Sequence, residues 1–158
     1  MIEESGTKVV FIAPAPDRNS ECPHQKKCLV DQDDNCSKSG IIYEAICSDC
    51  PVDNELIPHK YIGTSGQNLH ARTILHQKDV SAGKMSSSLY KHNAKYHQNS
   101  LSDSSRFRFK RVHNISDNIS RLLTESHAIF HSSDKLINSK GEYSASKWVS
   151  LDMRSNGT

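Results

Sequence analysis

The sequence predicts an α/β domain of the α+β kind, in which helices flank a small three-stranded antiparallel sheet. Two observations support this: three segments carry apolar residues with the spacing of a strand, and three others carry them with the spacing of a helix. At 158 residues with 35% hydrophobic content, the chain can bury one modest core. We divide it into a flexible segment 1–20, a cysteine-rich segment 21–39, a folded domain 40–150 and a tail 151–158.

The net charge and the amino terminus limit partners and compartment. A charge of +2 and a pI near 8.3 neither require nor exclude nucleic acid as a partner. Glu3 and Glu4 stand where a signal peptide has basic residues, and the apolar run Val9 to Ala13 is too short for one. Nothing approaches a membrane span. We therefore expect an intracellular, nuclear protein with no membrane partner, whose cysteines are reduced or bound to metal.

The cysteines predict a zinc site. Three of them lie in a stretch with too little apolar content to form its own core, and two follow as a Cys-x-x-Cys pair. Zn²⁺ takes four tetrahedral ligands and commonly holds such segments inside cells. A disulfide and free structural thiols remain as alternatives. Four of the five cysteines form the candidate set, with two histidines as further candidates: Cys22, Cys28, Cys36, Cys47 and Cys50, with His24 and His59.

The first two strands should form an antiparallel pair. Residues 41–47 alternate well, with Tyr43 on one face and Glu44 on the other, and the second strand lies around Tyr61. Pairing would bring Tyr43 and Tyr61 together. The acidic, proline-containing stretch from Ser48 to His59 reads as a long surface loop between the strands.

A helix should follow the second strand. Gly63 and Gly66 allow a tight reversal, and Asn68 is a good N-cap for a helix that carries Leu69, Ile74, Leu75 and Val80. Arg72 and His76 stand one turn apart on one face of this helix. Together with Tyr61, they form a predicted binding site for phosphate oxygens.

The third strand and the second helix carry basic residues and histidines. The helix begins at Ser86 to Ser88 and bears His92 and His97, which we interpret as surface residues rather than ligands. The strand spans Arg106 to Val112 with its phenylalanines inward. Its basic face is either simply solvated or in contact with a DNA backbone. That face consists of Arg106, Arg108, Lys110 and Arg111.

The last helix should run from Asp117 to about His131. Glu125 lies at the edge of its apolar stripe, where a carboxylate is costly unless a cation meets it. A divalent metal would meet that need, and a surface pair with Arg121 is the alternative. The stripe consists of Ile119, Leu122, Leu123, Ile129 and Phe130.

These segments resemble the GIY-YIG nuclease family over roughly residues 40 to 150. Ile41 departs from the family pattern, because glycine is expected there and Gly40 lies one residue earlier. The cysteine-rich segment and the Cys-x-x-Cys pair resemble the endonuclease end of Penelope-like retroelements. The matching elements, in chain order, are Ile41-Ile42-Tyr43, Tyr61-Ile62-Gly63, Arg72, His76, Glu125 and Leu136-Ile137-Asn138.

The resemblance implies a metal-dependent DNA endonuclease that nicks target DNA for retroelement insertion, with an upstream reverse transcriptase as a further partner. Glu125 would hold Mg²⁺ or Mn²⁺, and Arg72 would brace the scissile phosphate. Tyr43 would be the general base or would position the nucleophile, while Tyr61 and His76 would contact the phosphate or relay the proton. The expected DNA contacts are Asn138, Lys60, Arg106, Arg108 and Lys110.

The sequence is also compatible with two other functions. One is a structure-specific repair nuclease, although no RING-type zinc module or helix-hairpin-helix segment is visible in the sequence. The other is a zinc-stabilised nucleic-acid-binding module whose nuclease site has decayed.

Overall fold

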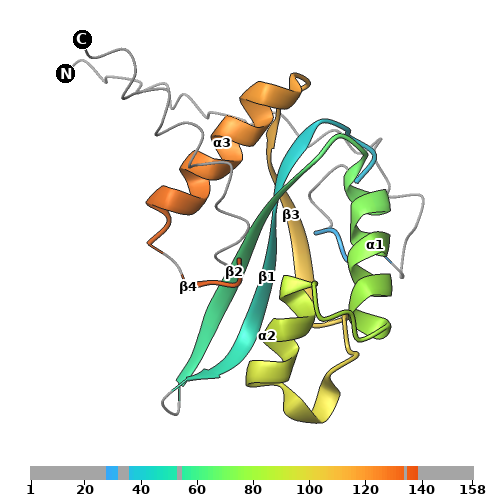
Figure 1. Cartoon of the computed structure of the whole chain (residues 1–158), viewed down its shortest axis with the longest axis vertical. Coiled ribbons are helices and arrows are strands. Elements are labelled where there is room, and N and C mark those ends of the chain that lie inside the picture. Colours follow the sequence, from blue (N-terminus) through green and yellow to red (C-terminus); the bar gives the residue numbers. More distant parts are fainter. Residues whose placement is uncertain (1–27, 32–35, 53–54, 134, 139–158) are drawn as a thin grey trace, which may run out of the picture.

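The computed structural model describes residues 28–31, 36–52, 55–133 and 135–138. Over these residues the fold is α+β, with a four-stranded mixed sheet and three α-helices (Figure 1). The strands lie in the order β3-β1-β2-β4. In chain order the elements are β1 (Ile41–Val52), β2 (Glu55–Ser65), α1 (Leu69–Ser81), α2 (Ser88–Tyr96), a 3-10 turn (Gln98–Ser100), β3 (Phe107–Asn114), α3 (Asn118–His131) and β4 (Lys135–Leu136).

The antiparallel part of the sheet confirms the predicted pairing. Strand β1 lies between β2 and β3, and Tyr43 is opposite Gly63 while Ala45 is opposite Tyr61. The prediction of three strands was incomplete, because β4 adds a short strand parallel to β2. A strand of two residues, Lys135 and Leu136, has no periodicity that a sequence pattern can detect.

The predicted loop from Ser48 to His59 is wrong. Strand β1 continues to Val52 and β2 resumes at Glu55, so these residues form the far end of a long hairpin. A bulge lies between Cys47 and Cys50, where Ser48 and Asp49 stand opposite Pro58 alone. Proline has no N–H to donate, so a bulge is a place where a strand tolerates it.

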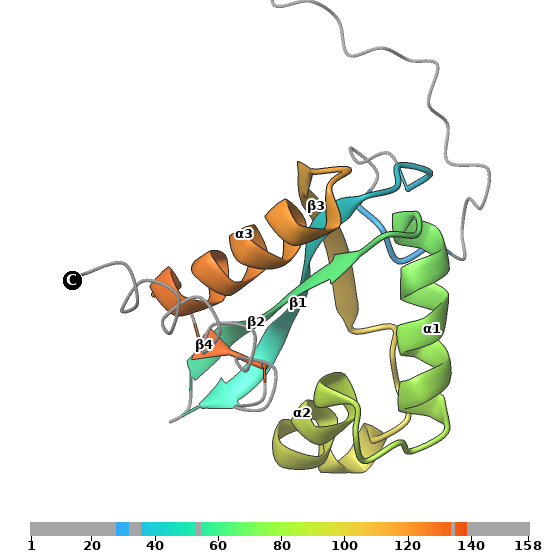
Figure 2. The same cartoon turned by 45° about the horizontal axis from the view of Figure 1, so that its top comes forward.

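Two layers cover the sheet, one on each face. Helices α1 and α2 lie on one side and α3 on the other, as both views show (Figures 1 and 2). The larger core lies under α1 and α2 and includes Tyr43, Tyr61 and Phe109. The smaller core lies under α3 and joins Ile42, Ile62 and Ile129. The alternation predicted for residues 41–47 therefore holds, since odd and even positions enter different cores.

The helix starts follow from their capping residues. Asn68 accepts a hydrogen bond from Ala71 N at the start of α1, and Asp117 accepts one from Ser120 N at the start of α3. Helix α1 ends at Ser81 with Ala82 as its C-cap, and Gly83 follows at a φ of +66°, a conformation that favours glycine. Its buried face differs in part from the prediction, because Leu75 is exposed and Thr73 and His76 are buried.

The rotation of α3 also differs from the prediction. The Arg121 guanidinium is buried and donates hydrogen bonds to Ile115 O and Ser116 O, which fixes the side of the helix that faces the sheet. Ala128 and Ile129 then pack inward. Of the five residues predicted as the buried stripe only Ile129 is buried, and four are exposed: Ile119, Leu122, Leu123 and Phe130.

Among the helices that the structure describes, none has the length and apolar content needed to cross a bilayer. The predicted segments 1–20 and 151–158, with Cys22 and His24, lie outside the described residues. Val30 forms a parallel bridge to Phe109, and so the middle of the cysteine-rich segment lies along the free side of β3.

Candidate active site and metal centre

The Tyr43 hydroxyl lies between a guanidinium and an imidazole. Arg72 Nε donates to Tyr43 Oη at 3.0 Å, and Tyr43 Oη lies 2.7 Å from His76 Nε2. Since the oxygen accepts from Arg72, its own proton is free to be donated to His76. The hydrogen bonds then run in one direction, from Arg72 through Tyr43 to His76, and this requires that His76 Nε2 be unprotonated.

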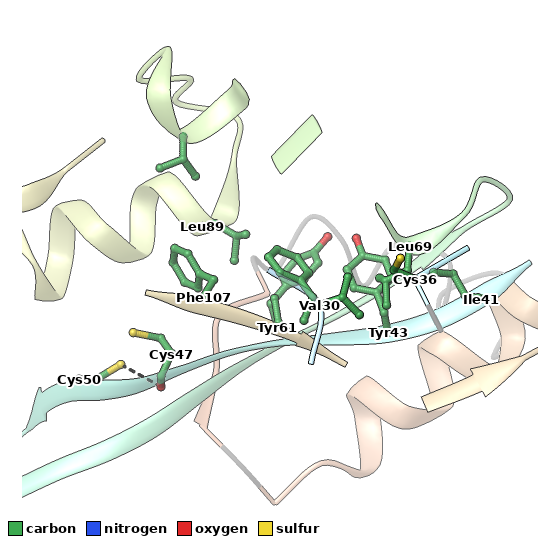
Figure 3. Close-up of a cluster of buried hydrophobic side chains, with 13 residues drawn as sticks. Val30, Cys36, Ile41, Tyr43, Cys47, Cys50, Tyr61, Leu69, Leu89 and Phe107 are labelled. Atoms are coloured by element: carbon green, nitrogen blue, oxygen red, sulfur yellow. Dashed lines mark hydrogen bonds between the residues drawn. The ribbon is translucent and has the colours of Figure 1, made fainter. Parts of the chain in front are cut away.

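Gly63 makes room for this cluster. Tyr43 is fully buried and folds over Gly63, its partner in the neighbouring strand. A Cβ at position 63 would lie 2.6 Å from Tyr43 Oη and 2.8 Å from the Tyr61 ring, closer than real atoms approach. The glycine of the Tyr61-Ile62-Gly63 sequence is therefore required by the close approach of two phenols. Figure 3 shows both tyrosines on the same face of the sheet.

Aromatic packing buries His76 and keeps it neutral. Its ring stacks on Phe109 with centroids 5.6 Å apart and meets the Tyr61 ring edge-on at 5.6 Å. This burial, together with the charge of Arg72, lowers the pKa of His76 to about 3. At neutral pH the imidazole is therefore a hydrogen-bond acceptor for Tyr43 rather than a cation.

A pocket opens beside the cluster, between α1 and the start of α2. It holds about 340 Å³ of empty space, part of it open to solvent. Tyr43 does not line it, so the phenol that a bound molecule meets is Tyr61. One carboxylate, Asp79, belongs to its wall and also forms an ion pair with Lys84 at 3.1 Å. The lining residues are Tyr61, Arg72, His76, Asp79, Ser86, Ser87, Ser88 and Leu89.

Asn138 acts on the backbone of β2. Its Nδ2 donates to Ile62 O at 2.7 Å, and its Oδ1 accepts from Ile62 N at 2.9 Å. The side chain is buried, and its carboxamide makes the two hydrogen bonds that the backbone of a neighbouring strand would make to Ile62. Asn138 therefore orders the strand that carries Tyr61 and Gly63.

Glu125 comes from the other side of the sheet. It is half-buried on α3, one turn from Arg121 and one from Ile129, and α3 packs on the face opposite Tyr43 and Tyr61. Helix α3 comes near the end of β2 at Gly66. A Cβ on Gly66 would lie 3.5 Å from Arg121 Nη2, so the first turn of α3 lies against that end. The hydrogen bonds of the tyrosine cluster thus gather residues from β1 and α1, whereas Glu125 belongs to a separate layer.

Three of the predicted DNA-binding side chains share one face of the sheet, because Ile46 pairs with both Lys60 and Arg108 and the neighbouring Glu44 pairs with Lys110. Arg106 is largely buried and is held by Asp49 and Asp103. Lys60 forms an ion pair with Glu44 at 3.2 Å. The two exposed residues of the set, Arg108 and Lys110, pair in register with Ile46 and Glu44, which point to the α3 face.

A second cluster has the composition of a metal centre. The ligand atoms of Cys47, Cys50, His92 and His97 all lie within 4.8 Å of one another. Cys50 Sγ lies 3.3 Å from His92 Nε2, and Cys47 Sγ lies 3.3 Å from His97 Nε2. With Zn–S near 2.3 Å and Zn–N near 2.0 Å, the edge of a tetrahedron is about 3.5 Å. The four residues could therefore hold a zinc ion with little movement.

The local backbone favours metal-bound thiolates at this cluster. The bulge at Ser48 and Asp49 turns Cys47 and Cys50 to the same face of β1, as Figure 3 shows. Backbone N–H groups of Asp49 and His59 donate to Cys47 and Cys50 and lower their pKa, but burial is the larger effect and raises the pKa of both thiols. A bound cation would reverse that effect by stabilising the charged form.

The cluster shares two residues with the predicted zinc ligands. Cys47 and Cys50 belong to the cluster, but the other two members are histidines of α2 and its C-cap, not upstream cysteines. Of the two histidines interpreted as surface residues, His92 is buried and His97 is half-buried. The available signal was the spacing itself, since Cys-x-x-Cys followed by His-x4-His is the pattern of two-cysteine, two-histidine zinc sites.

The remaining candidates for zinc lie elsewhere. Cys28 Sγ is 3.7 Å from His70 Nδ1, and Cys36 is buried beside the start of α1, where its carbonyl accepts from His70 N. His59 is buried against the rings of His92 and Tyr96, outside the four-residue group. Cys22 lies outside the described residues.

Comparison of the chain with family models, with curated proteins and with solved structures found no match.

Proposed function

We propose that the chain is a metal-dependent DNA endonuclease that hydrolyses a phosphodiester bond. The observation that supports this best is the hydrogen-bonded series from Arg72 through Tyr43 to His76. Hydrolysis needs a group that takes a proton from water and a cation that neutralises the phosphoryl oxygens. These three side chains offer both functions beside a pocket with room for a phosphate group.

Tyr43 is the proposed general base. An unperturbed phenol has a pKa of about 10, so it needs a neighbouring positive charge to act near neutral pH. Arg72 supplies that charge, and neutral His76 orients the phenol by accepting its hydrogen bond, while solvent takes the proton that Tyr43 must lose before it acts as a base. Because Tyr43 is fully buried, Arg72 must move toward the substrate before water meets the Tyr43 oxygen. Tyr61 lines the pocket and is the proposed first contact of the phosphate.

The catalytic cation needs a carboxylate, and the chain offers two. The family resemblance assigns Mg²⁺ or Mn²⁺ to Glu125, which would have to reach the phosphate past the end of β2. There Gly63 and Gly66 leave the strand edge without side chains. Asp79 already lines the pocket with Arg72 and His76. Both cations prefer oxygen ligands, so either carboxylate suits their chemistry.

Zn²⁺ is the proposed occupant of Cys47, Cys50, His92 and His97. Two thiolates and two imidazoles at tetrahedral spacing leave no open coordination position, which is typical of structural zinc. Bound there, zinc would supply a cross-link between β1 and α2. The resemblance to Penelope-like elements adds the wider proposal that the substrate is target DNA for retroelement insertion.

A plasmid-nicking assay tests the proposal. Zinc-loaded protein should convert supercoiled plasmid to the nicked form when Mg²⁺ or Mn²⁺ is present and not when only EDTA-treated buffer is used. Arg72→Gln should abolish nicking, whereas Lys78→Gln, on the exposed side of the same helix, should keep it. Asp79→Asn and Glu125→Gln, compared side by side, should identify the cation ligand as the one whose loss removes the metal dependence.

One observation favours the non-enzymatic alternative. Glu125 belongs to the layer on the opposite side of the sheet from the tyrosines. A nuclease site that had lost its metal ligand would show the same separation. Plasmid that stays intact with either cation, while the zinc-loaded protein binds DNA with steep salt dependence, would reject the endonuclease in favour of a binding module. Preference for branched DNA over plain duplex would instead indicate a repair nuclease.

A further inference from the structure

Helix α3 presents an apolar stripe that points away from the sheet. Ile119 is 68% exposed, Leu123 46% and Phe130 74%. Leu122, at 37%, lies on the flank of the same stripe. These are among the largest exposed apolar side chains of the described residues, and they gather on one helix.

The stripe follows from helical geometry. Residues 119, 123 and 130 are separated by four and seven positions, so they share one face. Arg121, Glu125 and Ile129 follow the same spacing on the opposite face, toward the sheet. Ser126 and His127 complete the outer face, which carries no acidic residue, lysine or arginine. Scattered exposed apolar residues are ordinary, whereas a continuous uncharged stripe indicates a binding surface.

The size of the stripe limits what binds it. A helix of 14 residues is about 21 Å long, and pairing two such helices buries less than the roughly 1,200 Å² of a stable interface. A second copy of the chain would therefore bind weakly. A segment of the same chain needs far less affinity, because its tether gives it an effective concentration of about a millimolar.

The chain beyond Asn138 is long enough to reach the stripe. The described chain ends at Asn138, whose carboxamide is bonded to the backbone of Ile62, and the Ile62 side chain packs against Ile129 of α3. Beyond it, residues 148–151 carry Trp148, Val149 and Leu151 within four positions. The ten residues from Asn138 to Trp148 can span up to about 33 Å, more than the length of α3.

We propose that the segment 148–151 packs on the outer stripe of α3, with the Trp148 indole against Leu123 and Phe130. This surface lies on the opposite layer from Tyr43 and Arg72, and the proposal is independent of the endonuclease activity.

Trp148 is the only tryptophan of the chain, so its fluorescence reports the contact directly. In the full chain its emission should be blue-shifted relative to free indole, and it should be protected from acrylamide. Leu123→Asp and Phe130→Asp should each shift the emission to the red and raise the quenching constant several-fold. Met85→Asp is the matched control, because Met85 is 67% exposed and lies far along the chain, between α1 and α2. Far-UV circular dichroism confirms that each variant is folded.

Two results would overturn the proposal. Emission of a solvent-exposed indole in the wild type, unchanged in both α3 variants, would mean that the segment does not dock. A blue shift that fades on dilution, together with a dimer in sedimentation that Leu123→Asp dissociates, would mean that a second copy covers the stripe.

Discussion

Removal of the metal from Cys47, Cys50, His92 and His97 should release α2 while the sheet stays folded. Helix α2 has nine residues, fewer than the roughly 12 that an isolated helix needs in water. Its buried face holds one large aliphatic side chain, Leu89, the others being Ser88, His92 and Asn93.

The magnitudes favour release. Burial of Leu89 contributes about 2 kcal/mol. The two hydrogen bonds from Asn93 Nδ2 to Leu101 O and Asp103 O contribute about 1 kcal/mol each. Ordering nine residues costs at least about 9 kcal/mol of backbone entropy, only part of which the helix's own hydrogen bonds offset. Structural zinc contributes roughly 10 kcal/mol in peptide systems, so the metal decides whether α2 stays in place.

Hydrogen exchange measures this outcome. In zinc-loaded protein the amides of α2 should be protected, and after chelation, or in Cys50→Ser, they should exchange rapidly. The amides of β1 and β2 around Tyr43 and Ile62 should stay protected in both states, which shows that the sheet remains folded. Cys28→Ser is the control, because Cys28 lies outside the four-residue group. Equal protection of α2 with and without zinc would refute the reasoning.

Two further predictions concern the tyrosine cluster. Gly63→Ala should destabilise the fold by about 2–3 kcal/mol, because its Cβ would meet Tyr43 Oη at 2.6 Å. Gly66→Ala, whose nearest neighbour is Arg121 Nη2 at 3.5 Å, should cost much less, and urea unfolding compares the two; equal losses would contradict the steric account. The second prediction is a loss of stability in acid. Because the pKa of His76 is lowered to about 3, the unfolded chain binds the proton more readily. The contribution of neutral His76 to the free energy of unfolding is complete above pH 6.5, and roughly 4 kcal/mol of it is lost as the pH falls to 3. His76→Gln should flatten unfolding free energy against pH in that window, and an unchanged slope would contradict it.

Local signals predicted the helix starts and the first strand pair. Asn68 and Asp117 cap their helices through side-chain oxygens, a contact that depends on the next three residues only. Likewise, alternation over residues 41–47 is enough to separate the Tyr43 face from the Ile42 face. Such features depend on chain neighbours, so they can be read before any tertiary contact is known.

Tertiary packing, and not the sequence pattern, decides the structure of the hairpin end and the rotation of α3. The hairpin end contains Pro51, Pro58 and acidic residues, which read as a loop, yet it extends both strands. In α3 the most apolar stripe faces outward, because Arg121 fixes the rotation through carbonyls of the preceding turn. Periodicity identifies an apolar face but not what it packs against. The proposed histidine ligands can be identified only once α2 is known to contact β1. They lie more than 40 residues from the cysteines, and the spacing in the sequence only suggests the match.

The two candidate sites differ in what holds them, and helix α2 connects them. Tyr43, Arg72 and His76 stand on the buried sheet and α1, so their hydrogen bonds do not depend on zinc. The pocket beside them should depend on it, because Ser87 and Ser88 form part of its wall at one end of α2, while His92 and His97, the proposed zinc ligands, lie at the other. Loss of zinc should therefore weaken binding in the pocket and leave the Tyr43 geometry unchanged. In the proposed nuclease, loss of zinc should therefore reduce affinity for DNA before it disturbs Tyr43, Arg72 and His76.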